Sequence, residues 1–291
     1  MGATPPLAVQ RWALFDGHAV DALVTTRQGG TSTGPHSSLN LGLHVGDDPG
    51  CVVENRRRAA AALGLELADL VFCTQSHGRG VAVVDRTHRG RGTTSVADAL
   101  PGADALVTAT PHVGLVTMVA DCVPLVLYEP AAQVLACVHA GWRGTVARAV
   151  DAAIQSMATL GGRPNRILAG IGPALADYQV GSEVAAAARH CFGSQVDELV
   201  QPDGTGRWRF NLKAANRRVL LDAGVPAANI DVSRAATGEG SPLFSDRAAR
   251  PCGRFAALAA LRPTSNDGAA ASAWTKGRGP TREGTRGKAE A

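Results

Sequence analysis

Short apolar runs closed by turn residues constrain the fold of this chain more than any other feature of its sequence. None is longer than nine residues, and Gly, Pro or Asp lies close to the ends of most of them. Runs of this length with such boundaries are typical of buried strands rather than helices. They lie at residues 19–26, 70–75, 80–85, 104–108, 113–121, 124–129, 134–140 and 166–172. The sequence therefore predicts sheet structure built from largely buried strands.

Helices are expected between and after these strands. Asp47 or Asp48 can cap a helix that begins near Pro49, because a carboxylate there can accept the free backbone N–H groups of the first turn. Amphipathic, alanine-containing patterns predict three more helices, at 145–160, 182–191 and 212–223. The mixture, which shows no internal repeat, predicts an α/β or α+β fold.

Length and cysteine usage narrow the class of protein. The chain has 291 residues, and the part that looks foldable ends near Arg262, which suits one large domain or two small ones. No apolar run approaches the length of a membrane span, and the first residues lack the segments of a signal peptide. The six cysteines form no CxxC pair, so we expect free thiols. Together these features predict a soluble cytoplasmic protein.

The charge distribution argues against nucleic-acid binding. The formal net charge is +4, and half of it lies in residues 264–291, which hold five basic against three acidic residues. The remaining body is nearly balanced and only 4% of the chain is aromatic, so the body offers no basic stripe or stacking platform. Residues 263–291 are rich in Gly, Ala, Thr and charge, which predicts a disordered tail.

Several common catalytic motifs are absent from the sequence. No G-x-G-x-x-G opens a helix after a strand, and no G-x-x-x-x-G-K-[ST] occurs, so the glycine-rich loops that hold phosphates in nucleotide sites are missing. G-x-S-x-G, the nucleophile motif of many serine hydrolases, is also missing. The chemistry must therefore come from other residues.

Cys122, His139 and His77 are candidate metal ligands. In the strand expected at 134–140, alternation places His139 on the same face as Cys137, at the end of the strand. In the strand expected at 113–121, the same alternation continued to Cys122 places it on the face opposite Asp121. If the two strands are neighbours, Cys122 and His139 meet at one edge of a sheet. Two imidazoles and a thiolate suit zinc and leave a fourth position for water or substrate. The spacings of 45 and 17 residues match no compact metal motif, so the residues alone also allow buried side chains with no metal.

The order of ten sequence blocks resembles the YfiH-like family, also called the laccase-domain or multicopper polyphenol oxidase family. The resemblance covers about residues 19–262 and leaves residues 1–18 as an N-terminal extension. The blocks are TTRQGG, SSLNLGLHVGDD, NRRRAAAALGL, TQSHG, ADALVT, ADCVPLVLYEP, VHAGWRGT, GIGPALADYQVGSEV, FNLKAANRRVLLDAGV and LFSDR followed by CGRFAAL. A-D-C-x-P and H-A-G-W-R-G-T are the most specific of them.

The resemblance carries expectations about fold, cofactor and activity. It implies one α+β catalytic domain in which two packed mixed sheets are flanked by helices (α/β/β/α), distantly similar to the catalytic domain of cytotoxic necrotizing factor toxins. It also implies a zinc site formed by His77, Cys122 and His139. Family members are described as purine nucleoside phosphorylases, so a purine nucleoside and phosphate are the expected partners, with adenosine deaminase activity as a second reaction.

The chain departs from the family pattern near its C-terminal end. Ser76 replaces a valine before the first histidine, which is a minor change. Ala236 stands in place of a cysteine, Asp246 in place of a tyrosine and Ala248 in place of a second arginine. Cys252 stands in place of a threonine. These changes predict an altered substrate preference or affinity if the family's side chains contact substrate.

Arginine is the expected phosphate ligand, because its planar fork binds two oxygens at once. Arg27 in the TRQGG loop and Arg143 after HAGW are the first candidates, followed by Arg247 and Arg254.

Two polar residues complete the set of candidates. Asp121 can orient a ligand or carry a proton, although strand alternation also allows it to face away. Asn40 is a candidate for substrate contact or, alternatively, for stabilising its own loop.

Three other functions stay open at this point. A thiol hydrolase of cell-wall precursors would use Cys122 as nucleophile, His139 as base and His77 as the orienting group. A copper polyphenol oxidase could add Met118 as a weak fourth ligand, but the eight histidines are scattered without an H-x-H pair, so copper is expected only as an adventitious occupant of the zinc site. A non-enzymatic binding protein would keep the pocket without turnover.

Overall fold

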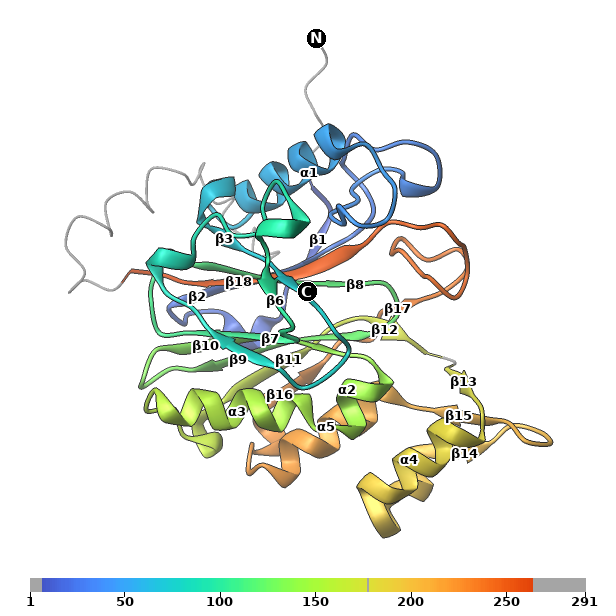
Figure 1. Ribbon diagram of the computed structural model, residues 1–291. Helices are drawn as coiled ribbons and strands as arrows, with labels where there is room; N and C mark the ends of the chain where they lie inside the picture. Colours follow the sequence, from blue (N-terminus) through green and yellow to red (C-terminus); the bar gives the residue numbers. More distant parts are fainter. Residues whose placement is uncertain (1–6, 177, 264–291) are drawn as a thin grey trace, which may run out of the picture.

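Two β-sheets pack face to face between two layers of helices in the computed structural model (Figure 1). The structure describes residues 7–176 and 178–263. The five-stranded sheet runs in the order β1 (Val9–Gln10), β2 (Val20–Thr25), β18 (Phe255–Leu261), β8 (Gly114–Val119) and β3 (Leu70–Val71). The six-stranded sheet runs in the order β16 (Ile230–Val232), β11 (Leu168–Ile171), β9 (Val123–Glu129), β10 (Val134–Ala140), β7 (Ala105–Thr108) and β5 (Val81–Val83).

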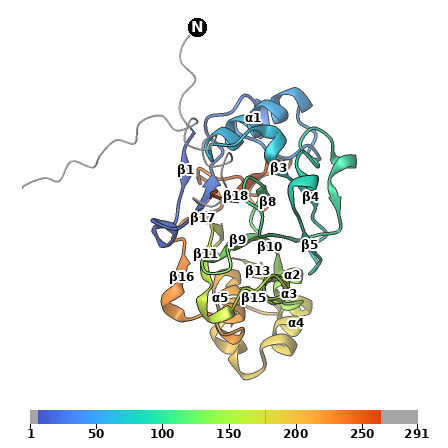
Figure 2. The ribbon, with the colours of Figure 1, turned by 90° about the vertical axis from the view of Figure 1, so that its left-hand side faces the viewer.

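Helices cover the outer face of each sheet. Helix α1 (Pro49–Ala61) lies over the five-stranded sheet, while α3 (Ala149–Thr159) and α5 (Leu212–Asp222) lie over the six-stranded sheet (Figures 1 and 2). Both sheets are mixed, because β3–β8, β5–β7 and β11–β16 are parallel pairs and the other pairs are antiparallel. The predicted α+β fold, with two mixed sheets in an α/β/β/α arrangement, is confirmed.

Smaller elements extend this frame at one end. Helix α4 (Ser182–Phe192) lies beside a three-stranded sheet, and two short parallel pairs join loops. The short strands are β13 (Gln179–Val180), β15 (Trp208–Phe210), β14 (Val200–Pro202), β12 (Ala174–Leu175), β17 (Ala236–Thr237), β4 (Cys73–Thr74) and β6 (Leu100–Pro101).

Three apolar layers account for the continuous apolar runs in the sequence. In β9, Leu125 and Leu127 pack toward the helices, whereas Val126 and Tyr128 pack between the two sheets. A third layer lies between the five-stranded sheet and the segment around α1. A strand with two buried faces has no polar side, so it reads as an unbroken apolar run rather than an alternating one.

The helix expectations hold with one correction. Asp48 caps α1 by accepting the Cys51 backbone N–H at 2.9 Å. The helix predicted at 145–160 was wrong at its start, because the chain forms a short helix α2 (Trp142–Val146), passes through a left-handed residue at Arg148, and then forms α3. No Gly or Pro marks this break, so the sequence offered no signal for it.

Residues 7–18, part of the predicted N-terminal extension, pack into the domain. Trp12 and Phe15 are 5% and 4% exposed, and the Trp12 indole donates to the Ile171 carbonyl at 3.3 Å. A side chain at Gly170 would collide with that indole, since its Cβ would lie 2.7 Å from the ring.

Other expectations concern cysteines, membrane spans and the tail. All six cysteines are free thiols. Of the helices in the described ranges, none is long and apolar enough to cross a membrane. The disordered tail was predicted for residues 263–291, of which residues 264–291 lie outside the described residues.

Candidate metal centre and its cavity

Cys122 lies where the chain crosses from one sheet to the other. Strand β8 belongs to the five-stranded sheet and β9 to the six-stranded sheet, and residues 120–122 connect them. β9 pairs with β10 in a register that sets Pro124 opposite His139, so Cys122 arrives beside His139. The route assumed from the sequence was wrong, because β8 does not pair with β10, and the left-handed Asp121 (φ 86°) breaks the alternation before Cys122.

His77 reaches the same place on the loop that follows β4. This loop folds around the carboxylate of Asp104, which accepts the backbone N–H groups of His77 (2.9 Å) and Gly78 (2.7 Å) and the hydroxyl of Ser76 (2.8 Å). His77 has a left-handed backbone with φ 59°. The carboxylate therefore fixes the loop conformation that presents His77.

The three predicted ligands converge. The candidate ligand atoms of His77, Cys122 and His139 all lie within 4.8 Å of one another, and the two imidazole rings meet edge to face with centroids 4.7 Å apart. Gly141 keeps the space open, since a Cβ there would lie 2.9 Å from the Cys122 Sγ and 3.1 Å from the His77 ring. Two nitrogens and one sulfur at this spacing fit a four-coordinate transition metal with one open position.

Asp104 orients His139 and was not among the sequence candidates. Its Oδ1 lies 2.9 Å from His139 Nδ1, and both side chains are buried, at 0% and 2% exposed. Burial alone would raise the pKa of this carboxyl group, but hydrogen bonds from His139, Ser76 and Gly78 lower it to about 2. An ionised Asp104 fixes His139 Nδ1 as a donor and leaves Nε2 for a metal, an arrangement common in zinc sites. The only sequence signal was its place in the ADALVT block.

Cys122 and His139 shift each other's titration. Burial opposes ionisation of Cys122, but hydrogen bonds to His139 and His77 lower the pKa of its thiol. Burial opposes protonation of His139, but Asp104 and Cys122 raise the pKa of its imidazole. The environment thus favours a thiolate at Cys122, which is the form that binds metals and attacks electrophiles.

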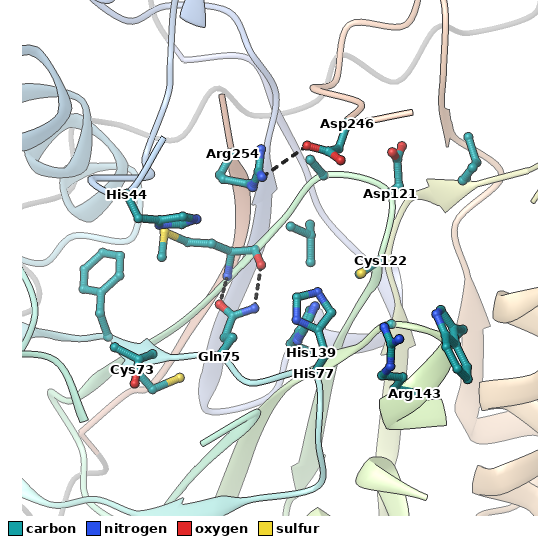
Figure 3. A pocket seen from close by; sticks show the side chains of 18 of the residues that line it. His44, Cys73, Gln75, His77, Asp121, Cys122, His139, Arg143, Asp246 and Arg254 are labelled. Carbon is teal, nitrogen blue, oxygen red and sulfur yellow. Dashed lines mark hydrogen bonds and ion pairs between the residues drawn. The ribbon is translucent and has the colours of Figure 1, made fainter. Parts of the chain in front are cut away.

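The three residues line a cavity of about 560 Å³. Figure 3 shows His77, Cys122 and His139 at its centre, with Arg143 on one side and His44 and Arg254 on the other. The predicted substrate residues Arg143, Arg247 and Arg254 line this cavity.

Arg27 and Asn40 were candidates for substrate contact, but the structure places both outside the residues that line the cavity. Arg27 donates to the Ser37 carbonyl at 2.8 Å and its guanidinium stacks on Phe244. Asn40 is fully buried, and its amide binds its own loop and accepts the Arg254 backbone N–H at 2.8 Å. The contacts of Asn40 are therefore those of a residue that stabilises its own loop, which was the second alternative.

Asp121 lines the cavity and anchors the C-terminal loop. Its carboxylate accepts hydrogen bonds from the Thr237 hydroxyl (2.5 Å), the Ser245 hydroxyl (2.7 Å) and the Arg247 backbone N–H (2.7 Å). These contacts hold the loop before β18 against the crossing between the sheets. Asp121 thus positions Arg247 rather than contacting the ligand set.

Arg143 and Arg247 are bound loosely by the protein. Arg143 stacks on Trp142, with its guanidinium carbon 4.4 Å from the ring centroid. The Arg247 guanidinium lies over Tyr178 and donates to the Gln179 carbonyl at 3.3 Å.

Asp104, rather than His77, contacts His139 Nδ1, at 2.9 Å, which is the contact that the orienting group of a thiol hydrolase would make. The sulfur of Met118, the nominal fourth copper ligand, contacts the Arg56 guanidinium at 3.7 Å.

Two packed sheets flanked by helices, with His77, Cys122 and His139 gathered where the chain passes from one sheet to the other, define a class of protein with a metal-type site. The family model described as multi-copper polyphenol oxidoreductase laccase matches residues 21–262. The chain therefore belongs to this YfiH-type laccase-domain family.

Named relatives and solved structures agree with this membership. The chain is 40% identical over 213 residues to adenosine deaminase RL5 from an unknown prokaryotic organism, covering 72% of this chain and 81% of that protein. It is 39% identical over 224 residues to purine nucleoside phosphorylase YlmD of Geobacillus stearothermophilus, covering 76% of this chain and 82% of the relative.

The fold is also similar to two crystal structures. YlmD from Geobacillus stearothermophilus superposes with a TM-score of 0.81 at 35% identity, covering 89% of this chain and all of that one. YfiH from Bacillus licheniformis superposes with a TM-score of 0.81 at 32% identity, covering 88% of this chain and 99% of that one.

Proposed function

We propose that this protein is a purine nucleoside phosphorylase, which uses phosphate to displace a purine base from a nucleoside and form ribose 1-phosphate. The observation that carries the proposal is one cavity that joins the His77, Cys122 and His139 group to several arginines. The names of YlmD and of other relatives support the same reaction. A volume of about 560 Å³ suits small-molecule sites, which are about 300–1,000 Å³.

The donor set fits zinc, which His77, Cys122 and His139 would hold. When bound, zinc supplies a Lewis acid that can stabilise developing negative charge or lower the pKa of water. Copper could replace it adventitiously, because nitrogen and sulfur sites bind copper strongly. Asp104 holds the His139 ring in one orientation and one tautomer through Nδ1.

Other residues of the cavity would bind and orient the two substrates. The aromatic rings of Trp142 and Tyr178 line it and offer flat faces to a purine or ribose. Arg143 and Arg247, stacked on these rings, can donate to charged phosphate oxygens or to the neutral hydroxyl oxygens of ribose. Partial enclosure limits water, which favours attack by phosphate over hydrolysis.

A second reaction, deamination of adenosine, is supported by the name of the relative RL5. It would use the same ligand group, since zinc deaminases activate water at such sites.

A thiol hydrolase is the competing function from another class. Cys122, His139 and Asp104 form a nucleophile, a base and an orienting carboxylate in contact, which is the minimum that such catalysis needs. Polyphenol oxidation, which the family description names, receives less support. The described part of the chain contains a single group of three or more His, Cys, Asp or Glu residues that is spaced for a metal.

Chromatography of reactions with adenosine, with and without phosphate, tests the proposal. Phosphate-dependent release of adenine that disappears in Cys122→Ala is the expected result. Inosine would identify the deaminase instead. Activity that survives a strong chelator and is lost on alkylation would identify the thiol hydrolase, and ligand-induced thermal stabilisation without any product would identify a binding protein.

A further inference from the structure

One end of the cavity contains a buried arginine whose charge no carboxylate compensates. Arg56 on α1 is 1% exposed and lines the cavity. Its Nε and Nη1 donate to the carbonyls of Leu41 (2.8 Å), Gly92 (2.6 Å) and Thr93 (3.0 Å). Its guanidinium lies over the Phe72 ring, with the carbon 3.9 Å from the ring centroid, and its Nη2 contacts the Met118 sulfur at 3.7 Å. None of the described carboxylates forms an ion pair with it.

A buried guanidinium without a counterion is unfavourable, because solvation by water has been lost and neutral carbonyls replace it incompletely. Burial lowers the pKa of Arg56 to about 9, which still leaves the group protonated at neutral pH. An anion bound beside it in the cavity would supply the missing counter-charge. The Arg56 Nη2 group, which lacks an oxygen acceptor, is the donor left for such an anion.

Of the two neighbouring residues, Arg254 adds a positive charge and His44 adds a polar ring. His44 and Arg254 line the same end of the cavity and lie together on one side of the ligand group (Figure 3). Burial is the largest cause of the lowered pKa of His44, and the charges of Arg254 and Arg56 lower it further. The neutral His44 ring can therefore form hydrogen bonds but adds no charge. The cavity lining as a whole contains five arginines against two aspartates.

Asp246 is the one carboxylate at this end, and two arginines share it. It pairs with Arg250 at 2.6 Å and, more distantly, with Arg254 at 3.4 Å. The other lining carboxylate, Asp121, is occupied by hydroxyl and backbone donors. The protein therefore supplies Arg254 with a weak internal anion that a stronger ligand could displace.

We propose that Arg56, His44 and Arg254 form an oxyanion site that binds a phosphate group, and that Asp246 competes with this ligand for Arg254. The inference deepens the proposed function, because phosphate is the second substrate of a phosphorylase. It places phosphate on the side of the ligand group opposite Arg143. The aromatic side, with Trp142 and Tyr178, is left for the nucleoside.

Titration calorimetry of the full-length protein with inorganic phosphate tests this site without any turnover. Arg254→Gln removes one charged donor and should weaken binding at least about tenfold, the usual effect of losing a charged hydrogen bond. Asp246→Asn removes the competing charge and should tighten binding. Arg57→Gln is the matched control, because Arg57 follows Arg56 on α1 but pairs with Glu54 on the exposed face, and its phosphate affinity should equal that of the unchanged protein.

Arg56→Gln can fail to fold because Arg56 ties together three loop carbonyls, so the proposal is judged on the Arg254 and Asp246 variants. Unchanged phosphate affinity in Arg254→Gln, or weaker affinity in Asp246→Asn, would overturn it. Loss of phosphate binding in Arg143→Gln with retention in Arg254→Gln would place the anion on the other side and also overturn it. Phosphorolysis with an unchanged KM for phosphate in Arg254→Gln would overturn the site and leave the proposed reaction standing.

The same titrations distinguish a free phosphate from the phosphate of a nucleotide. In a Cys122→Ala background, inorganic phosphate that binds equally well with and without adenosine identifies the free ion. Adenosine 5′-monophosphate that binds more tightly than adenosine, with the advantage lost in Arg254→Gln, identifies a nucleotide phosphate. Either result supports the oxyanion site, whereas no phosphate binding in any form refutes it.

Discussion

Replacing Asp104 by asparagine is the sharpest test of how this site is held together. The carboxylate accepts four hydrogen bonds, two at each oxygen: His139 Nδ1 and the His77 N–H at Oδ1, and the Ser76 hydroxyl and the Gly78 N–H at Oδ2. An asparagine amide keeps one oxygen, and its NH₂ group must face two donors whichever way it turns.

The magnitude follows from those contacts. Two donors lose their acceptor, and because the loop contacts are part-buried, each loss costs at most about 1–3 kcal/mol. The lowered pKa of Asp104 gives a similar figure, because a shift from 3.8 to about 2 corresponds to about 2 kcal/mol of stability carried by its charge. We expect Asp104→Asn to lower the free energy of unfolding by about 3 kcal/mol and Tm by roughly 6–12 °C. Metal affinity should fall about 10–100-fold, as when other partners of metal-binding histidines are removed.

Thermal denaturation and competition with a metal-binding dye measure the two effects. Asp98→Asn is a suitable control, because Asp98 is an exposed aspartate outside the site whose partner is Arg91. Ser76→Ala should give a smaller loss of stability, since it removes one of the four donors. The reasoning is refuted if Asp104→Asn keeps both the Tm and the metal affinity of the unchanged protein.

Three further predictions follow from the same geometry. Gly141→Ala should abolish metal binding, measured by elemental analysis, because its Cβ would enter the space beside Cys122 Sγ. Gly181→Ala, at a helix N-cap of similar backbone conformation with no atom near its Cβ, is the control and should bind metal normally. Equal metal content in the two variants would contradict this prediction. In protein treated with a chelator at pH 7, iodoacetamide should modify Cys122 before Cys73. Cys73 lines the same cavity, but burial raises the pKa of its thiol to about 12. Mass spectrometry of the peptides shows the order of modification, and faster reaction of Cys73 would contradict the prediction. Because Asp104 has a folded-state pKa of about 2, below its usual 3.8, its stabilising charge is present above about pH 4 and is lost as the pH falls toward 2. The stability difference between the unchanged protein and Asp104→Asn should therefore shrink between pH 4 and 2 in denaturant titrations, and a constant difference would count against the assignment.

The sequence predicted that Cys122 and His139 lie close together because both lie at the ends of clear strands. Cys122 precedes β9 and His139 lies in β10, and short strands with turn residues at their ends are easy to locate. The path between them was wrong, since alternation assumes a continuous strand, and the left-handed residue at Asp121 turns the chain from one sheet into the other. Such a crossing depends on the pairing of β8 with β18, which is distant in sequence, while β9 pairs with the adjacent β10.

The supporting residues were harder to predict because long-range contacts define them. Asp104 begins an ordinary apolar run, and only the folded loop around His77 brings four donors to its carboxylate. Arg56 sits in an arginine-rich helical segment that reads as a solvated surface, yet it is buried while its neighbour Arg57 is exposed. Arg27, in a glycine-rich loop typical of ligand binding, instead stacks on Phe244 and stabilises the loop.

The most direct test of the proposed reaction is ³¹P NMR of the protein with a purine nucleoside and inorganic phosphate, with free base measured in the same sample. Phosphorolysis predicts a new phosphate monoester resonance that grows in equal amount with the released base and is absent in Cys122→Ala. Base or inosine formed without any loss of inorganic phosphate would contradict the phosphorylase and assign the cavity to a hydrolytic reaction.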